Sequence, residues 1–400
     1  IYAIQFFAFI ISIVTYVIYL FLFAKENKLI FIIQTIYIIS GMFDISWFFF
    51  GLEKFKITVI RNIIIKFLTV ISIFLFVKTK NDLAQYTLIM VLGTLLSQIY
   101  LWKYLWKEVN SIKIDKDIIR ENIKPILILF IPVLSFSIYK VMDKIMLGNM
   151  ANYEQVGYYN NAEKITNIPM GIITALGAVM LPRMSTLIAE GENKKTERYI
   201  IMSIKLVTVL ASAIAFGLMG ISKVFTPIFF GESFSACAPI IILLSITVFF
   251  ISWANVVRTQ FLIPKHYDKI YIFSTIIGAV VNLTLNLIFI PKYQAMGAAL
   301  GTIAAEFLLM FIQAFSIRKD INVFKVIFEY LAFIILGLLM MIIVQIIGEI
   351  MRTNIKTIIF QILSGIIIYC IGALIILKIK NDELFQNIRD IIFKTLKIRI

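Results

Sequence analysis

The stretch "FDISWFFFGLEKFKITVIRNIIIKFLTVISIFLFVKTKNDL", residues 43–83, indicates the fold class of this chain. It ends one apolar run, makes a short basic turn at 52–56 and enters a second apolar run at 57–77. About 20 apolar residues in a helix cross a hydrocarbon core of roughly 30 Å. The stretch therefore predicts two antiparallel membrane-spanning helices joined by a short turn.

The same pattern extends along the whole chain. Of its 400 residues, 61% are hydrophobic and 15% are charged, whereas soluble domains are about 45–50% apolar and about 25% charged. We therefore expect an all-α polytopic membrane protein with twelve spans. The predicted spans are 1–23, 29–51, 57–77, 83–102, 124–148, 157–180, 199–221, 237–257, 270–290, 295–317, 326–348 and 356–377.

The basic residues of the connections predict the orientation. One set of alternate connections, which includes 103–124 and 378–400, holds 24 Lys and Arg residues, and the other set holds 8. Cytoplasmic connections carry the excess of positive charge. We therefore expect the first set and the C-terminus to be cytoplasmic. The net charge of +15 is then largely a topology signal, and no nucleic-acid partner is expected.

Charges inside the predicted spans are informative, because a charge at mid-bilayer costs about 2.5–3.5 kcal/mol. Lys66 lies at the centre of 57–77, and Asp44 lies at a similar depth in the preceding span. An internal ion pair and a pair exposed to a water-filled cavity both fit this placement. Arg61 and Lys205 lie nearer to span ends, so we expect their long side chains to reach the headgroups.

A second group of charges lies in "SIYKVMDKIMLGNMANYEQVGYYNNAEKI", residues 137–165. The first three are spaced i, i+3, i+4 and share one helix face. A reversal of the chain after them brings the last two to the same depth in the outer half of the membrane. Opposite charges can pair across this hairpin, but one positive charge remains in surplus, which favours a polar, cationic cavity. The five residues are Lys140, Asp143, Lys144, Glu163 and Lys164.

Polar residues also occur in the spans near 270–317. Glu306 is a lone carboxylate at mid-membrane, and it is expected to be protonated, paired to another helix or part of an ion pathway. Asn282 and Asn286 share one helix face and favour hydrogen bonding between helices. Small residues in the same predicted span as Glu306 let a neighbouring helix approach closely; they are Gly297, Gly301 and Ala305.

The sequence offers little for catalysis. It has no phosphate-binding loop, a single histidine and two distant cysteines. We therefore expect no cofactor, no metal site and no enzymatic activity.

Three stretches of the chain resemble the Wzx-type polysaccharide flippases. This is the polysaccharide transport family, in the multidrug/oligosaccharidyl-lipid/polysaccharide exporter superfamily. The similar stretches are 43–83, "DKIMLGNMANYEQVGYYNNAEKI" with "IPMGIITALGAVMLPRMS" (143–165 and 168–185), and "VNLTLNLIFIPKYQAMGAALGTIAAEF" (281–307).

The resemblance implies two helical lobes around a central cavity, with about fourteen helices in a full member. On this mapping the first two helices of the first lobe are missing. The implied parts are a first lobe at 1–102, a cytoplasmic linker at 103–123, a second lobe at 124–317, an extra helix pair at 318–378 and an amphipathic cytoplasmic tail at 379–400.

The resemblance further implies a function in the bacterial plasma membrane. Members flip undecaprenyl-diphosphate-linked oligosaccharide units from the inner to the outer leaflet for capsule, exopolysaccharide or O-antigen assembly, by alternating access coupled to an ion gradient. The expected partners are the lipid-linked oligosaccharide, membrane lipids, and polysaccharide polymerase and chain-length machinery. Lys66, Lys140, Lys144 and Lys164 would face the anionic head, and Asp44, Asp143, Glu163 and Glu306 would pair with them or couple ions.

Two other functions stay open. One is a multidrug or metabolite antiporter of the same superfamily, for which we expect an acidic cavity. The other is a membrane-embedded glycosyltransferase or polymerase, which would transfer sugar without flipping it.

Overall fold

The computed structural model describes residues 1–23, 28–52, 54–109, 116–382 and 386, and every regular element in this part of the chain is helical. Ten helices of the described part are long and apolar enough to cross a membrane. One of them, α10 (Asp268–Ser316), contains two predicted spans, and α6 (Lys116–Met150) covers the predicted span 124–148. The expected all-α polytopic fold is therefore confirmed.

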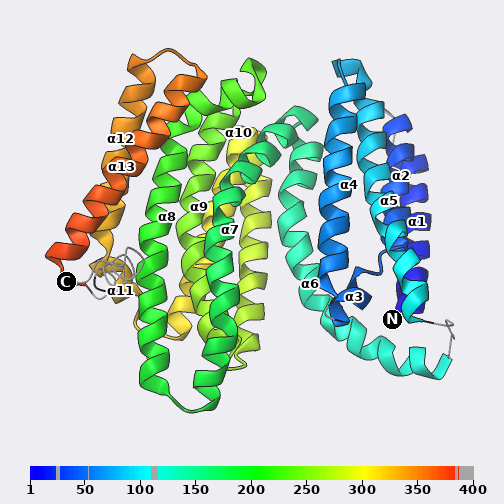
Figure 1. Cartoon of the computed structure of the whole chain (residues 1–400), viewed down its shortest axis with the longest axis horizontal. Coiled ribbons are helices and arrows are strands. Elements are labelled where there is room, and N and C mark those ends of the chain that lie inside the picture. The colour runs from blue at the N-terminus through cyan, green and yellow to red at the C-terminus, as the bar shows by residue number, and fades with distance from the viewer. Residues whose placement is uncertain (24–27, 53, 110–115, 383–385, 387–400) are drawn as a thin grey trace. The chain divides into compact units, whose positions relative to one another are not determined.

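The chain divides into two compact units, Ile1–Ile131 and Pro132–Ile400. The first unit contains the start of α6 and five earlier helices (Figure 1). Its small buried core lies where the short helix α3 meets α5. The five helices are α1 (Tyr2–Phe23), α2 (Lys28–Met42), α3 (Ser46–Gly51), α4 (Phe55–Phe76) and α5 (Leu83–Glu108).

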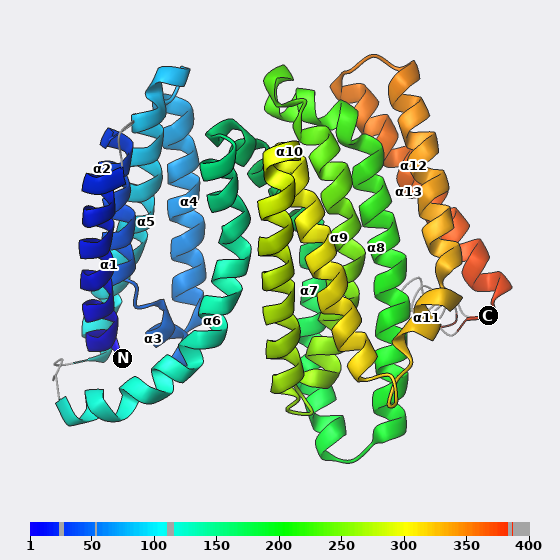
Figure 2. The ribbon, with the colours of Figure 1, turned by 180° about the vertical axis from the view of Figure 1, so that it is seen from behind.

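The second unit is a larger bundle in which α9 is the most enclosed helix. The neighbouring helix α8 packs against α9 and against the hairpin of α12 and α13 (Figures 1 and 2). The indole of Trp253 on α9 donates a 2.9 Å hydrogen bond to the Thr208 hydroxyl on α8. The further helices of this unit are α7 (Tyr153–Ala189), α8 (Asn193–Phe230), α9 (Cys237–Val257), α11 (Val323–Glu329), α12 (Leu331–Ile350) and α13 (Ile355–Ile379).

A sharp break divides α10 at the predicted connection 291–294. The backbone of Gln294 leaves the helical region, with φ 52° and ψ −128°, three residues after Pro291. The two halves then meet so closely that a Cβ added to Gly297 would lie 2.3 Å from the carbonyl oxygen of Phe289. The predicted pair of spans is thus present, and glycine is needed where their backbones touch.

The expected division into lobes, linker and tail stays a prediction. Much of the expected linker 103–123 lies in the end of α5 and the start of α6, while 110–115 are outside the described residues. The expected amphipathic tail is also outside them from residue 387 onward.

Candidate functional site

A buried carboxylate joins three helix segments of the second unit. Asp143 on α6 is 5% exposed. Its Oδ2 accepts hydrogen bonds from the Tyr159 hydroxyl on α7 at 2.7 Å and from the Thr302 hydroxyl on α10 at 2.9 Å. Its Oδ1 accepts from the Asn286 amide on α10 at 2.5 Å. These contacts satisfy an ionised carboxylate, which can only accept hydrogen bonds.

The neighbouring charges pair across the hairpin of α6 and α7. The Lys144 ammonium lies 2.7 Å from the Glu163 carboxylate. The sequence predicted that these residues lie at one depth and that opposite charges there can pair, and both expectations are confirmed. The Lys164 side chain is exposed beside this pair, while the Lys140 side chain is outside the described part of the structure. The roles assigned to these lysines stay predictions.

One of the two asparagines predicted to join helices, Asn286, does so, whereas the hydrogen bond of Asn282 stays within its own helix. Asn286 donates to Asp143 on α6 and, at 3.2 Å, to the Oδ1 of Asn282 one turn earlier. The amide of Asn286 also lies against the small-residue face of the second half of α10, where a Cβ on Gly301 would be 2.3 Å from its Oδ1. The predicted close approach at Gly301 is therefore confirmed.

A polar cavity of about 400 Å³ begins at the Asp143 cluster and lies wholly within the second unit. Its α7 lining extends from Tyr159 to Thr174, a length of about 22 Å at 1.5 Å per residue. Three carboxylates line it, those of Asp143, Glu163 and Glu306. Glu306, predicted as a lone mid-membrane carboxylate, is thus brought together with the charges of the α6–α7 hairpin.

Arg258 is the one Lys or Arg among the described residues that line this cavity. It follows α9 directly, in a turn of π-helix at Arg258–Leu262. Its guanidinium lies 5.7 Å from the ring centre of Tyr271, which also lines the cavity. Because the predicted span ends at residue 257, the sequence places Arg258 in a basic connection and does not predict that it lines the cavity. The spacing of Asn255 and Arg258, three residues apart at the end of an apolar helix, was the available signal.

In the first unit, the expected pair of Asp44 and Lys66 is not formed. Asp44 lies in the break between α2 and α3, where its Oδ1 accepts a 2.8 Å hydrogen bond from the amide of Ser46. Lys66 is exposed on α4. The prediction assumed a straight helix through Asp44, whereas the chain turns there. The transport roles proposed for both residues stay predictions.

Among the described residues of the first unit, the buried cation is instead Arg61. It is 4% exposed and donates to the Ser97 carbonyl at 2.9 Å and to the Gln98 side chain at 3.1 Å, both on α5. The Asp44 carboxylate contributes an attractive charge to it. The prediction that Arg61 reaches the headgroups is therefore wrong, because the helix face that carries it packs against α5.

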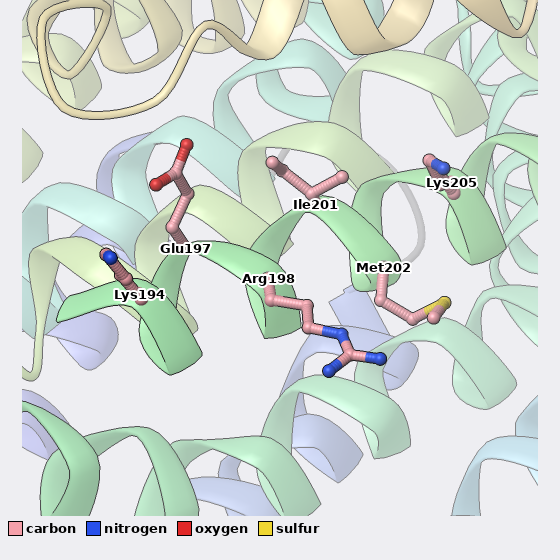
Figure 3. Close-up of a pocket in the computed structure, with 6 residues that line it drawn as sticks. All are labelled: Lys194, Glu197, Arg198, Ile201, Met202 and Lys205. Atoms are coloured by element: carbon pink, nitrogen blue, oxygen red, sulfur yellow. The ribbon is translucent and has the colours of Figure 1, made fainter. Parts of the chain in front are cut away.

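A separate hollow of about 230 Å³ follows one face of α8 (Figure 3). Two of its basic residues, Lys194 and Arg198, lie within the segment 181–198, which the sequence predicts to be a cytoplasmic connection. Such residues are typical of a helix end that meets anionic headgroups. The lining residues are Lys194, Glu197, Arg198, Ile201, Met202 and Lys205.

The candidate spans define a multi-pass membrane protein, and a charged cavity lies inside its second unit. Residues 1–188 match the family described as "Polysaccharide biosynthesis protein". The chain is 27% identical over 295 residues to a "Putative O-antigen transporter" of Shigella dysenteriae, with 72% of this chain and 73% of the relative covered. It is 24% identical over 278 residues to one of Escherichia coli (strain K12), with 68% and 66% covered.

Among solved structures, the chain is similar to "Lipid II flippase MurJ, inward closed conformation", with a TM-score of 0.72 and 19% identity. The match covers 89% of this chain and 75% of that one. This likeness establishes the fold. The family match and the O-antigen transporter relatives confirm the resemblance to polysaccharide flippases, and the relatives and the solved structure are by their names transporters rather than enzymes.

Proposed function

We propose that the protein flips undecaprenyl-diphosphate-linked oligosaccharide units from the inner to the outer leaflet of a bacterial plasma membrane. The observation that carries this proposal is the polar cavity of about 400 Å³ inside the second unit. A hydrophilic head group crossing a bilayer needs such a polar path, because each unsatisfied polar group in hydrocarbon costs several kcal/mol. The similarity to O-antigen transporters supports this substrate class.

The charged residues take separate roles in this proposal. Arg258 binds the diphosphate, since a guanidinium matches phosphate oxygens with two parallel donors. Lys66, Lys140 and Lys164 attract the anionic head as it enters. Asp143 and Glu306 couple the movement to an ion gradient, and the pair of Lys144 and Glu163 holds α6 and α7 in register around them.

Reconstitution tests the proposal directly. Proteoliposomes would receive a fluorescent lipid-diphosphate oligosaccharide, and its transfer between leaflets would be followed by accessibility to an impermeant reagent. We expect transfer with the wild type and at least tenfold slower transfer with Arg258→Gln. Transfer no faster than in protein-free vesicles would refute the proposal.

One observation favours the antiporter as a second candidate. The cavity is lined by three carboxylates and a single arginine among the described residues, and an acidic cavity suits a cationic substrate. Efflux of an organic cation such as ethidium from the same proteoliposomes, without transfer of the lipid-linked oligosaccharide, would establish this function instead.

A further inference from the structure

A hollow of about 260 Å³ lies within the first unit, between α4 and α5. Lys56, in the first turn of α4, and Tyr104, one turn before the end of α5, lie at one end of it. The 2.6 Å ion pair of Lys54 with Glu108 holds these two helix ends level with each other. The lining then follows α4 from Lys56 to residue 65, a length of about 14 Å at 1.5 Å per residue. This further lining on α4 is mainly aliphatic and includes Ile57, Ile60, Ile64 and Ile65.

Hydrogen-bond donors remain available at the Lys56 end of the hollow. The hydroxyls of Tyr100 and Tyr104 lie 3.1 Å apart, and either one can be the donor. Each hydroxyl has one proton, so the single bond between them leaves one proton for a further acceptor. Lys56 is exposed and forms no ion pair with the residues that the structure describes. These groups together suit an anion with several acceptor oxygens, such as a phosphate ester.

Arg61 adds a buried positive charge to the same lining. Its terminal nitrogens donate to α5, whereas its Nε is buried without a hydrogen-bond partner in the described part of the chain. A buried charge is costly unless an opposite charge lies close to it. An anion seated in the hollow would bring a negative charge beside this guanidinium.

The sequence around this end of the hollow is basic as well. The segments 53–56 and 103–108 contain four lysines and two glutamates, which leaves two positive charges in surplus. Both segments belong to connections that are predicted to be cytoplasmic, and anionic lipids of the cytoplasmic leaflet are attracted to such segments. Trp106, exposed in the last turn of α5, is typical of the membrane–water interface. The polar end of the hollow is therefore expected at headgroup depth.

The aliphatic part of the lining distinguishes a lipid from a soluble anion. Ile60 and Ile64 are 44% and 52% exposed, and they lie inside the predicted span 57–77, deeper than Lys56. A free phosphate would occupy only the polar end and leave these side chains uncovered. A phospholipid covers both parts, because its phosphate is joined to acyl chains that extend toward the membrane centre.

We infer that this hollow binds one anionic phospholipid of the cytoplasmic leaflet. The phosphate lies against the Lys56 ammonium and the tyrosine hydroxyls, and an acyl chain follows the isoleucines of α4. A zwitterionic lipid is disfavoured, because its own cation would face the surplus positive charge at this end. The inference does not depend on which substrate the protein transports.

Native mass spectrometry of the purified full chain in detergent tests this inference, because it resolves the binding of single lipid molecules. A titration would compare dioleoyl phosphatidylglycerol with dioleoyl phosphatidylcholine, which has the same acyl chains and no net charge. We expect the first phosphatidylglycerol to bind at least tenfold more tightly than the first phosphatidylcholine. Equal affinities for the two lipids would overturn the inference.

Variants locate the bound lipid. Lys56→Gln should weaken binding of the first phosphatidylglycerol about fivefold or more, and so should Tyr100→Phe combined with Tyr104→Phe, since loss of one hydrogen bond produces a factor of this size. The matched control is Lys378→Gln, an exposed position near the end of α13 that is also predicted to be cytoplasmic, and it should change nothing. Unaltered binding in both hollow variants would also overturn the inference.

Competition separates the possible sources of the phosphate. A large excess of inorganic phosphate should leave the lipid bound, because phosphate alone cannot cover the isoleucines. Displacement by inorganic phosphate, or by an equimolar amount of undecaprenyl diphosphate, would overturn the inference; the second result would assign the hollow to the transported lipid. None of these measurements involves transfer between leaflets, so a protein that fails to flip its substrate would refute the proposed function and leave the phospholipid site standing.

Discussion

Lys144 of α6 and Glu163 of α7 form an ion pair with 2.7 Å between nitrogen and oxygen, and about a quarter to a third of each side chain is exposed (30% and 25%). Removing one partner leaves the other charge at membrane depth without its counter-ion. We expect Lys144→Met or Glu163→Gln to lower the free energy of unfolding by about 2 kcal/mol, less than for a fully buried pair. Thermal unfolding of the detergent-purified protein would measure the loss.

Charge reversal supplies the control for that pair. The double variant Lys144→Glu with Glu163→Lys should recover most of the stability. Lys164→Met, at the exposed neighbouring position, should have little effect. A double variant no more stable than either single reversal would argue against direct pairing.

Removing a hydrogen bond to the Asp143 carboxylate should affect transport as well as stability. Tyr159→Phe removes the donor at 2.7 Å from Oδ2, and hydrogen bonds to charged groups contribute about 1.5–3 kcal/mol. We expect unfolding to become easier by about 2 kcal/mol and transport to slow markedly. Tyr153→Phe, on the same helix with 75% of its side chain exposed, is the matched control. Equal melting temperatures for the two variants would contradict this account of the cluster.

Two glycine substitutions should change the free energy of unfolding in opposite directions. Gly297→Ala places a methyl group 2.3 Å from a backbone oxygen of Phe289, so the halves of α10 must separate, and we expect a loss of at least 2 kcal/mol, or roughly the cost of overpacking a core. A Cβ on Gly157 in α7 meets nothing within 4 Å. Gly157→Ala should therefore stabilise the protein by about 0.5–1 kcal/mol through helix propensity. Melting temperatures that move in the same direction would contradict the packing at α10.

The predicted orientation can be tested by labelling with an impermeant thiol reagent. In a background without Cys237 and Cys370, Tyr153→Cys should react in intact cells, because the connection 149–156 is predicted to be outside. Glu192→Cys, in the connection between α7 and α8, should react only after permeabilisation. The reverse pattern would invert the topology and place the C-terminus outside.

The turn before α5 predicts a pH effect. The backbone amides of Lys78 and Thr79 donate to the Asp82 carboxylate at 2.9 and 2.7 Å, and they hold the pKa of Asp82 below its ordinary value of 3.8. A carboxyl group whose pKa is lower in the folded than in the unfolded state stabilises the fold at pH values above its ordinary pKa. This stabilisation is lost as the pH falls through the lowered pKa. The stability difference between wild type and Asp82→Asn should therefore shrink on acidification below about pH 4. A difference that stays constant from pH 7 to pH 3 would contradict this.

The sequence predicted those features of the fold that depend on length and spacing. Apolar runs located the spans, the polar segment at 291–294 located the break in α10, and the hairpin register placed Lys144 level with Glu163. Rotation about a helix axis was harder to predict. Depth alone placed Arg61 near a headgroup, whereas its face of α4 is buried against α5.

Local backbone geometry accounts for the other differences. Asp44 lies in a break between two helices, so a straight-helix register could not pair it with Lys66. Arg258 follows α9 in a π-helical turn that continues the helix, so a residue counted as a connection lines the cavity. Both deviations arise from a few φ/ψ values that hydrophobic periodicity does not encode.

Asp382, just beyond α13, contacts residues at one end of two other helices of the second unit, α8 and α12. Its Oδ2 accepts a 2.5 Å hydrogen bond from the Tyr330 hydroxyl, which directly precedes α12, and lies 3.1 Å from the Lys205 ammonium on α8. Sliding of the C-terminal hairpin along α8 would break both contacts at once. Any rearrangement of the second unit during a transport cycle should therefore carry α8, α12 and α13 as one rigid block, and leave α7 and the two halves of α10 to open and close the cavity.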